Sequence, residues 1–302
     1  MNRTDPTMPR ALGTTARREL LHLGALTKQL WRINFGVRAK IAGRSLRIPI
    51  LYGQGAQNLA LLEPGIFGAF ERLFAMQPGT FIDVGVNVGQ TLLKVKVLDP
   101  GRAYVGFEAN PRCCQYVEEL IRVNHFADCT LVPAGLSNRS GLTTLWLRPN
   151  VSFDPAATTI DEVCDARDSL RAQWAAICRG DDALADLNVE SLAVLKIDTE
   201  GAELEVLTGL AKTIDRFRPF IVCEILPVVD ERIPAGRIRL ERQLEVERLL
   251  RARQYDVFRL HADTRLEPID AIGVHDDLAL SNYLFVPCER RPQVTRAFVM
   301  RD

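Results

Sequence analysis

The sequence lacks the features that would place it among membrane-spanning, zinc-binding or repeat proteins. It contains no run of 18 apolar residues, so we expect no segment that crosses a membrane as a helix. Its seven cysteines include no C-x-x-C pair, which argues against a zinc knuckle or a dithiol redox motif. Reduced cysteines in a cytoplasmic protein are the simplest interpretation. There is no internal repeat and no low-complexity tract.

Net charge is also absent, because 38 basic residues balance 38 acidic ones, but the charge is unevenly distributed. Residues 1–50 hold ten Lys and Arg and only two acids. Such a stretch could touch a membrane surface, a polyanion or a partner, although a solvated basic helix packed on the main domain is the simpler interpretation. We expect no nucleic-acid partner and no stable membrane insertion, and a homodimer is compatible with the sequence.

Several short motifs with well-defined chemistry are missing as well. The sequence has no G-x-x-x-x-G-K-[ST] phosphate loop and no H-E-x-x-H zinc motif. None of its five tyrosines is followed four residues later by lysine, so the usual hydride-transfer dyad of short-chain dehydrogenases is missing.

What is present fits one large α/β domain with additions. The chain has 302 residues, 47% of them apolar, which is enough for a sizeable core. Strand and helix patterns alternate throughout residues 80–260, which predicts a mostly parallel sheet with helices on both faces. We expect a basic helical extension over residues 1–77, the α/β domain over 78–288 and a tail over 289–302. An acidic insertion over 148–190 could act as a lid over the substrate.

The individual elements follow from apolar periodicity and from Gly and Pro punctuation. The expected strands are residues 80–83, 103–107, 129–133, 141–147, 192–197, 219–223, 255–260 and 282–286, with residues 40–52 as a hairpin or extended segment. The expected helices are residues 15–35, 64–76, 91–98, 110–123, 167–178, 202–212 and 240–253.

The stretch from Phe81 to Gln90 is where ligand binding is first indicated. An apolar run ends at Asp83, and glycines and an asparagine follow before a helical pattern begins. A strand that leads through a glycine turn into a helix is typical of nucleotide-binding α/β domains. Glycine permits backbone angles closed to other residues and lets a ligand approach the main chain.

Four acids fall at the carboxyl ends of expected strands, namely Asp83, Glu108, Asp198 and Glu224. A parallel sheet brings these ends to one rim. Glu108 lies 25 residues after Asp83, close to the spacing at which an acid accepts hydrogen bonds from ribose hydroxyls. An acid at the start of the glycine loop would repel a pyrophosphate but suits a cationic adenosine-bearing ligand. S-adenosylmethionine is such a ligand.

Five motifs follow one another along the chain. They are F-I-D-V-G-V-N-V-G (81–89), G-F-E-A-N-P (106–111), L-K-I-D-T-E-G-A-E (195–203), C-E (223–224) and S-N-Y-L-F-V-P (281–287). As an ordered set they resemble the FkbM-type S-adenosylmethionine-dependent methyltransferases over roughly residues 78–288. The resemblance implies a Rossmann-like class I methyltransferase fold, whose seven-stranded sheet ends in an antiparallel strand. It also implies methyl transfer, usually to a hydroxyl oxygen of a sugar, polyketide or similar small metabolite.

The same resemblance implies which residues hold the cofactor. They are Asp83, Gly85, Asn87 and Gly89 in the glycine loop, Glu108 at the ribose, Ala109 and Asn110 beside the adenine, Ala134 and Ser137 in the adenine pocket, and Asp198 beside the methionine moiety. Val86 stands where the family commonly has alanine, a small departure that should not exclude the cofactor.

Methyl transfer from a sulfonium to an alcohol needs an aligned acceptor and a base that removes the hydroxyl proton. Asp198 and Glu200 are the candidate catalytic bases, and Lys196 could orient the acceptor or pair with a carboxylate. The Lys-x-Asp-x-Glu pattern could instead be a salt-bridge network that caps the next helix. His261 and His275 are alternative bases.

Other functions stay open at this point. A binding or scaffolding protein could have kept the fold and lost catalysis. A nicotinamide-dependent oxidoreductase would use a similar loop, but the missing glycines and the missing dyad disfavour it. Asp198, Glu200 and Glu224 could gather a divalent cation, since oxygen ligands suit Mg²⁺; we nevertheless expect no metal.

Overall fold

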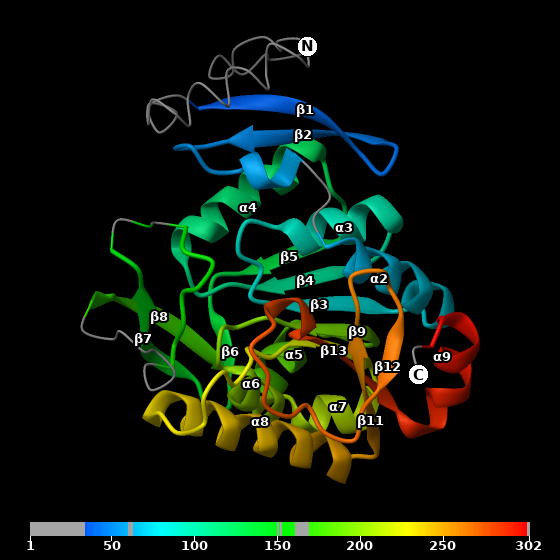
Figure 1. Ribbon diagram of the computed structural model, residues 1–302. Coiled ribbons are helices and arrows are strands. Elements are labelled where there is room, and N and C mark those ends of the chain that lie inside the picture. Colours follow the sequence, from blue (N-terminus) through cyan, green and yellow to red (C-terminus); the bar gives the residue numbers. More distant parts are fainter. Residues whose placement is uncertain (1–33, 60–62, 150, 152, 161–168, 301–302) are drawn as a thin grey trace.

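A central β-sheet brings together strands from most of the chain. The computed structural model describes residues 34–59, 63–149, 151, 153–160 and 169–300 (Figure 1). The sheet has eight strands. In spatial order they are β12 (Leu266–Pro268), β11 (Tyr255–Leu260), β13 (Asn282–Pro287), β10 (Phe220–Glu224), β9 (Leu192–Ile197), β3 (Thr80–Val84), β4 (Tyr104–Phe107) and β5 (Cys129–Val132).

The direction of the strands confirms the predicted topology. Strands β10, β9, β3, β4 and β5 pair in parallel, whereas β13 runs antiparallel to both β10 and β11. The seven predicted strands of the domain are all present, and β12 is a short additional strand at the edge. Every residue of β3 and β9 is buried, as expected for central parallel strands covered on both faces.

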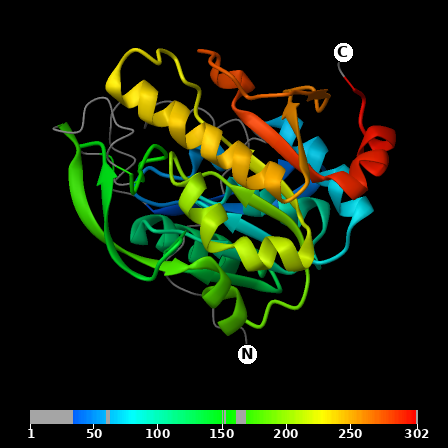
Figure 2. The same cartoon turned by 90° about the horizontal axis from the view of Figure 1, so that it is seen from below.

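Helices cover both faces of the sheet, which is also as predicted. The helices are α2 (Pro64–Met76), α3 (Gln90–Leu98), α4 (Pro111–Asn124), α5 (Gly180–Asp186), α6 (Glu203–Gly209), α7 (Ala211–Phe217), α8 (Pro234–Ala252) and α9 (Arg291–Ala297). Helices α2, α3 and α4 share one hydrophobic cluster above the sheet in Figure 1, and α5 to α8 share a second cluster below it. Figure 2 shows the long helix α8 crossing the lower face.

Most helix boundaries match the sequence pattern. Asn110 caps α4 by accepting a hydrogen bond from the backbone N–H of Arg112 at 3.1 Å, and Pro111 occupies the first turn. The helix expected over residues 202–212 is instead two short helices, α6 and α7. Helix α8 begins at Pro234, six residues before the predicted start at residue 240.

The chain before the sheet forms a hairpin of β1 (Phe35–Ile41) and β2 (Arg44–Ile50), consistent with the hairpin expected there. A 3₁₀ helix, η2 (Ala56–Leu59), follows it, and the later 3₁₀ turns are η5 (Leu278–Leu280) and η6 (Cys288–Arg290). Ile48 and Ile50 of the hairpin belong to the same hydrophobic cluster as α2, α3 and α4. The helix expected over residues 15–35 lies almost entirely outside the described residues.

A small second sheet contains the largest error of the sequence prediction. It orders β6 (Gly135–Ser137), β8 (Arg171–Arg179) and β7 (Gly141–Leu147), with β8 antiparallel to β7. The helix predicted over residues 167–178 is therefore wrong. Side chains of β8 alternate between the two faces, with Ala175 and Ile177 buried and Trp174 exposed. Seven-residue pairing with β7 outweighs the local helical preference of the alanines.

We expect Phe70→Ala to destabilise the fold by about 3–5 kcal/mol, because it leaves a cavity between α2 and the sheet. Phe70 of α2 is fully buried and packs edge-on against Phe81 of β3, with ring centroids 5.0 Å apart. Urea unfolding measures the effect. Leu244→Ala on the exposed side of α8 is the control and should cost less than about 1 kcal/mol. Equal unfolding free energies for the two variants would contradict the tight packing of α2 on the sheet.

Candidate active site

One cavity of about 250 Å³ opens at the carboxyl ends of the central strands. The loop after β3 and the end of β4 form one wall, where Gly85, Asn87 and Glu108 are exposed to it. The chain after β9 and the end of β10 form a second wall. Leu145 and Ile177 of the small sheet close the cavity from a third side. The predicted rim is therefore the place where the cavity lies.

The glycine loop has a backbone that only glycine fits at Gly85. Its φ is +89°, and an added Cβ would lie 1.8 Å from the backbone oxygen of Asp198. Asn87 also has a left-handed backbone, with φ of +49°. Gly89, with φ of +77°, caps the N-terminus of α3. The sharp turn brings the loop directly against the chain that leaves β9.

Glu108 connects the loop to the next strand. Its carboxylate accepts hydrogen bonds from the backbone N–H groups of Asn87 and Asn110, each at 2.7 Å. Burial raises the pKa of Glu108 to about 7, although both N–H groups act in the opposite direction. A carboxylate has about four acceptor positions, so this carboxylate can accept further hydrogen bonds from a ligand in the cavity.

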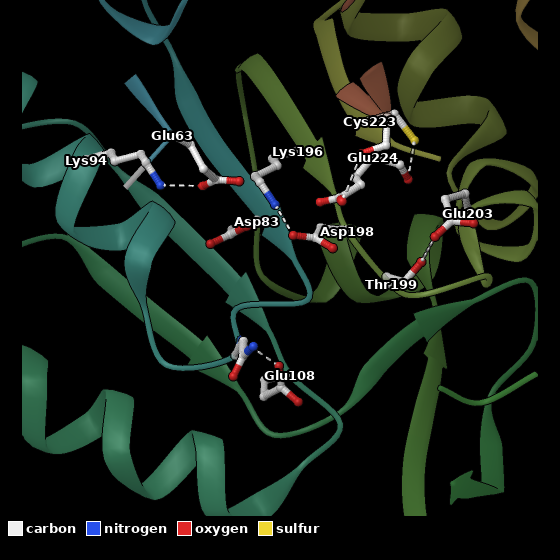
Figure 3. A network of polar contacts seen from close by, with 12 residues as sticks. Glu63, Asp83, Lys94, Glu108, Lys196, Asp198, Thr199, Glu203, Cys223 and Glu224 are labelled. Carbon is white, nitrogen blue, oxygen red and sulfur yellow. Dashed lines mark hydrogen bonds and ion pairs between the residues drawn. The ribbon is translucent and has the colours of Figure 1, made fainter. Parts of the chain in front are cut away.

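Asp83 lies beneath the cavity and does not line it. Its side chain is fully buried, and it accepts a hydrogen bond from the Tyr104 hydroxyl at 2.5 Å. Its other oxygen has no hydrogen-bond partner. Burial raises the pKa of Asp83 to about 6, and the neighbouring Lys196 limits the rise. Figure 3 shows Asp83 among the charged groups at the base of the site.

Lys196 and Asp198 form an ion pair with 2.7 Å between Nζ and Oδ2. The Lys196 side chain is only 4% exposed and does not line the cavity, whereas Asp198 does. Burial alone would lower the pKa of Lys196, but the charges of Asp198 and Asp83 offset it and raise the pKa. Lys196 therefore stays charged and fixes Asp198, as the salt-bridge interpretation of the motif anticipated.

Glu200 and Glu224 face the same cavity from the ends of β9 and β10. Burial raises the pKa of Glu200 to about 8, and the negative charges of Asp198 and Glu224 add to the rise. Burial and Asp198 likewise raise the pKa of Glu224 to about 7, while the Ser281 hydroxyl donates a hydrogen bond to it at 3.1 Å. Glu200 has a left-handed backbone with φ of +53°, an uncommon conformation that places it at the cavity.

The structure brings some of the other candidates to the cavity and leaves others outside it. Ala109 lines it, whereas Gly89, Asn110, Ala134 and Ser137 do not. Gly135 and Leu136, next to two of these, do line it. The alternative bases are elsewhere, since His261 pairs with Glu267 at 2.8 Å and His275 contacts the Tyr283 hydroxyl at 3.0 Å.

The acidic insertion contributes residues that the sequence did not single out. Asp154, Pro155, Ala157 and Thr159 all line the cavity. Asp154 is held by the Arg148 guanidinium, which donates two hydrogen bonds to it at 2.6 and 2.8 Å. Only the excess of acids in this segment hinted at a role. Among the described residues, no three His, Cys, Asp or Glu side chains are arranged to hold a metal ion.

The helices of the structure were compared with the length and hydropathy that a membrane span needs. In residues 34–300, apart from the short gaps, no helix is both long and apolar enough to cross a bilayer.

Comparison with known proteins gives a family for this arrangement. Residues 83–257, more than half of the chain, match the family model described as "Methyltransferase FkbM domain". No curated protein matches the chain.

Solved structures that match the chain include methyltransferases from several organisms. The FkbM methyltransferase of Methylobacillus flagellatus KT is 16% identical with a TM-score of 0.42, and the match covers 69% of this chain and 43% of that one. The present chain thus matches less than half of that protein. An O-methyltransferase of Bacillus cereus in complex with SAH is 9% identical, with a TM-score of 0.41 and coverage of 91% and 90%. Fibrillarin of Aeropyrum pernix with S-adenosyl-L-methionine is 10% identical, with a TM-score of 0.39 and coverage of 83% and 80%.

The glycine loop at residues 85–89, Glu108 at the end of the next strand and the acids after β9 and β10 all lie within the matched region. With its central sheet and its reversed last strand, the chain belongs to the FkbM methyltransferase family and has the class I methyltransferase fold.

Proposed function

We propose that the protein is an S-adenosylmethionine-dependent O-methyltransferase that acts on a hydroxyl of a sugar, polyketide or other small metabolite. The observation that carries the proposal is the Glu108 carboxylate, held by two loop N–H groups beside a glycine turn at the edge of the cavity. The Glu108 carboxylate could accept hydrogen bonds from the hydroxyls of a ribose, and the glycine turn lets the rest of the ligand approach the backbone.

The residues present fit a cationic adenosyl cofactor. Glu108 can accept hydrogen bonds from ribose hydroxyls, while Gly85 and Asn87 offer a loop surface without bulky side chains. The described residues that line the cavity include five carboxylates and no Lys, Arg or His. A cavity of this charge favours a sulfonium and an ammonium and disfavours a pyrophosphate, which counts against a nicotinamide dinucleotide. When bound, S-adenosylmethionine would supply an activated methyl electrophile.

Glu200 is the base that its place at the cavity and its raised pKa favour for the acceptor hydroxyl. An efficient proton acceptor has a pKa near the working pH. The pKa of Glu200, about 8, is nearer to neutral pH than the pKa of an ordinary carboxyl group. Asp198 also lines the cavity, but its carboxylate is engaged in the ion pair with Lys196. We assign Asp198 and Lys196 to binding and orientation, with Asp198 as the second candidate base.

The acceptor is expected at the side of the cavity formed by the acidic insertion. Asp154 and Thr159 lie there, and Arg148 holds Asp154 in place. Because these residues come from a segment inserted beside the small sheet, substitutions there should change acceptor preference more than cofactor affinity.

Glu108 is the residue that tests the proposed ribose site. Glu108→Ala should weaken the binding of S-adenosylmethionine and S-adenosylhomocysteine about 10- to 100-fold, as expected for hydrogen bonds to a charged group. Isothermal titration calorimetry measures both ligands, with NAD as a competitor of another class. Glu118→Ala, on the exposed side of α4, is the control and should bind as wild type does. A wild-type protein that binds NAD and neither adenosyl ligand would refute the proposed cofactor.

The raised carboxyl pKa values predict that cofactor binding depends on pH. At pH 7 the ligand-free protein keeps Glu200 mostly protonated and Glu224 about half protonated. A bound cation lowers both pKa values, so binding of S-adenosylmethionine should release protons and tighten as pH rises from 6 to 8. S-adenosylhomocysteine, which lacks the sulfonium charge, should release fewer protons. Calorimetry in buffers of different ionisation enthalpy counts the protons.

Glu200→Gln provides the control for this linkage, because it removes the carboxyl with the higher pKa. The difference in proton release between the two ligands should then shrink. An unchanged difference would show that Glu200 does not respond to the sulfonium.

The role of Glu200 as base gives a further prediction. Glu200→Gln should slow the formation of S-adenosylhomocysteine by about 100-fold or more with any hydroxyl acceptor that supports turnover. Its affinity for S-adenosylhomocysteine should stay within about threefold of wild type. Asp198→Asn, by contrast, should weaken cofactor binding as well, because it releases Lys196. Wild-type turnover by Glu200→Gln would reject Glu200 and leave Asp198 as the base.

A further inference from the structure

A side chain from outside the family match reaches the cofactor loop. Asn58 of η2 lies 25 residues before the matched region begins at residue 83. Its side chain is buried, and Nδ2 donates hydrogen bonds to the backbone oxygen of Val88 at 2.7 Å and to the Tyr116 hydroxyl at 3.2 Å. Val88 is part of the loop that runs from Gly85 to Gly89.

The tie continues from Asn58 into the hairpin and into α4. Tyr116 of α4 donates a hydrogen bond from its hydroxyl to the backbone oxygen of Pro49 in β2 at 2.9 Å. Between Pro49 and Asn58, Gly55 turns with φ of +104°, and an added Cβ would lie 2.4 Å from the Tyr116 hydroxyl oxygen. The tight turn at Gly55 therefore places Asn58 within hydrogen-bond distance of the Val88 backbone oxygen.

Val88 is placed where its position controls the cavity-facing residues. Asn87, immediately before it, lines the cavity and donates its N–H to Glu108. Gly89, immediately after it, caps α3. Val86 and Val88 point into the same hydrophobic cluster as Ile48 of the hairpin. The loop thus has one face toward the ligand and the opposite face toward the N-terminal hairpin.

The hydrogen-bond balance of Asn58 argues against a purely packing role. Its Oδ1 is buried and has no hydrogen-bond partner, which costs free energy. An apolar side chain of similar shape would avoid that cost. An apolar side chain could not, however, donate a hydrogen bond to the Val88 backbone oxygen, as Asn58 does.

We propose that Asn58 is a positioning residue for the cofactor loop, so that the segment before the methyltransferase domain completes the cofactor site. The inference rests on the proposed function. Asn58 does not line the cavity; it acts through the Val88 carbonyl on the Asn87 N–H and hence on Glu108.

The test compares variants of the full-length chain by cofactor affinity, unfolding and hydrogen exchange. Asn58→Leu keeps the approximate shape and removes the donor, and Asn58→Asp keeps the size and one oxygen. Both should weaken the binding of S-adenosylhomocysteine about tenfold. Both should also speed amide exchange of residues 85–89 in the ligand-free protein, because the loop has lost its tie.

Asn124→Ala is the matched control. Asn124 of α4 also ties the hairpin, because it donates to the backbone oxygen of Arg47 at 2.7 Å and accepts from the Arg47 N–H at 2.8 Å. It does not contact the loop, so this variant should lose stability and keep its affinity and its slow loop exchange.

The outcomes separate the inference from the function beneath it. Wild-type affinity and wild-type loop exchange in Asn58→Leu would overturn the inference and leave the proposed function intact. So would an equal loss of affinity in Asn124→Ala. A wild-type protein that binds neither adenosyl ligand would overturn the proposed function, and the loop exchange of the variants would still decide whether Asn58 holds the loop. If Asn58→Leu fails to fold, Asn58→Asp and Tyr116→Phe carry the same comparison.

Discussion

The site depends on the close approach of two backbones at the ends of β3 and β9. Gly85 turns so tightly that no side chain fits between it and the Asp198 backbone oxygen. The backbone N–H of Asp198 also donates a hydrogen bond to the backbone oxygen of Val84 at 2.9 Å. This contact places the loop that would receive the cofactor directly beside the acids that follow β9. The distance between the glycine loop and these acids is therefore set by the sheet itself.

Several charged side chains are buried next to the cavity. Lys94 pairs with Glu63 and Lys196 pairs with Asp198, each at 2.7 Å, and Asp83 lies between these pairs (Figure 3). The two buried lysines neutralise part of the negative charge beneath the cavity. Burial raises the pKa values of Glu200 and Glu224, and the charge of Asp198 adds to both rises. A cationic ligand in the cavity would favour the ionised forms of these two carboxyl groups.

Local patterns predicted most of the sheet and the rim of the site, because apolar runs and strand-end acids are visible in short windows. Of the four strand-end acids, Glu108, Asp198 and Glu224 line the cavity, whereas Asp83 is fully buried and does not. Strand β8 was missed because its conformation comes from pairing with β7, which the sequence does not encode locally. Asp154 and Asn58 were missed because each is a single polar residue whose role depends on a partner far along the chain.

The tie between Asn58 and Val88 also bears on how such a protein can diverge. Asn58 reaches the backbone oxygen of Val88 through a turn at Gly55 that leaves no space for a side chain. An insertion or deletion between Pro49 and Asn58 would move the donor away from the loop. The length of the leading segment therefore matters to the loop at residues 85–89, even though the match to the family model begins only at residue 83.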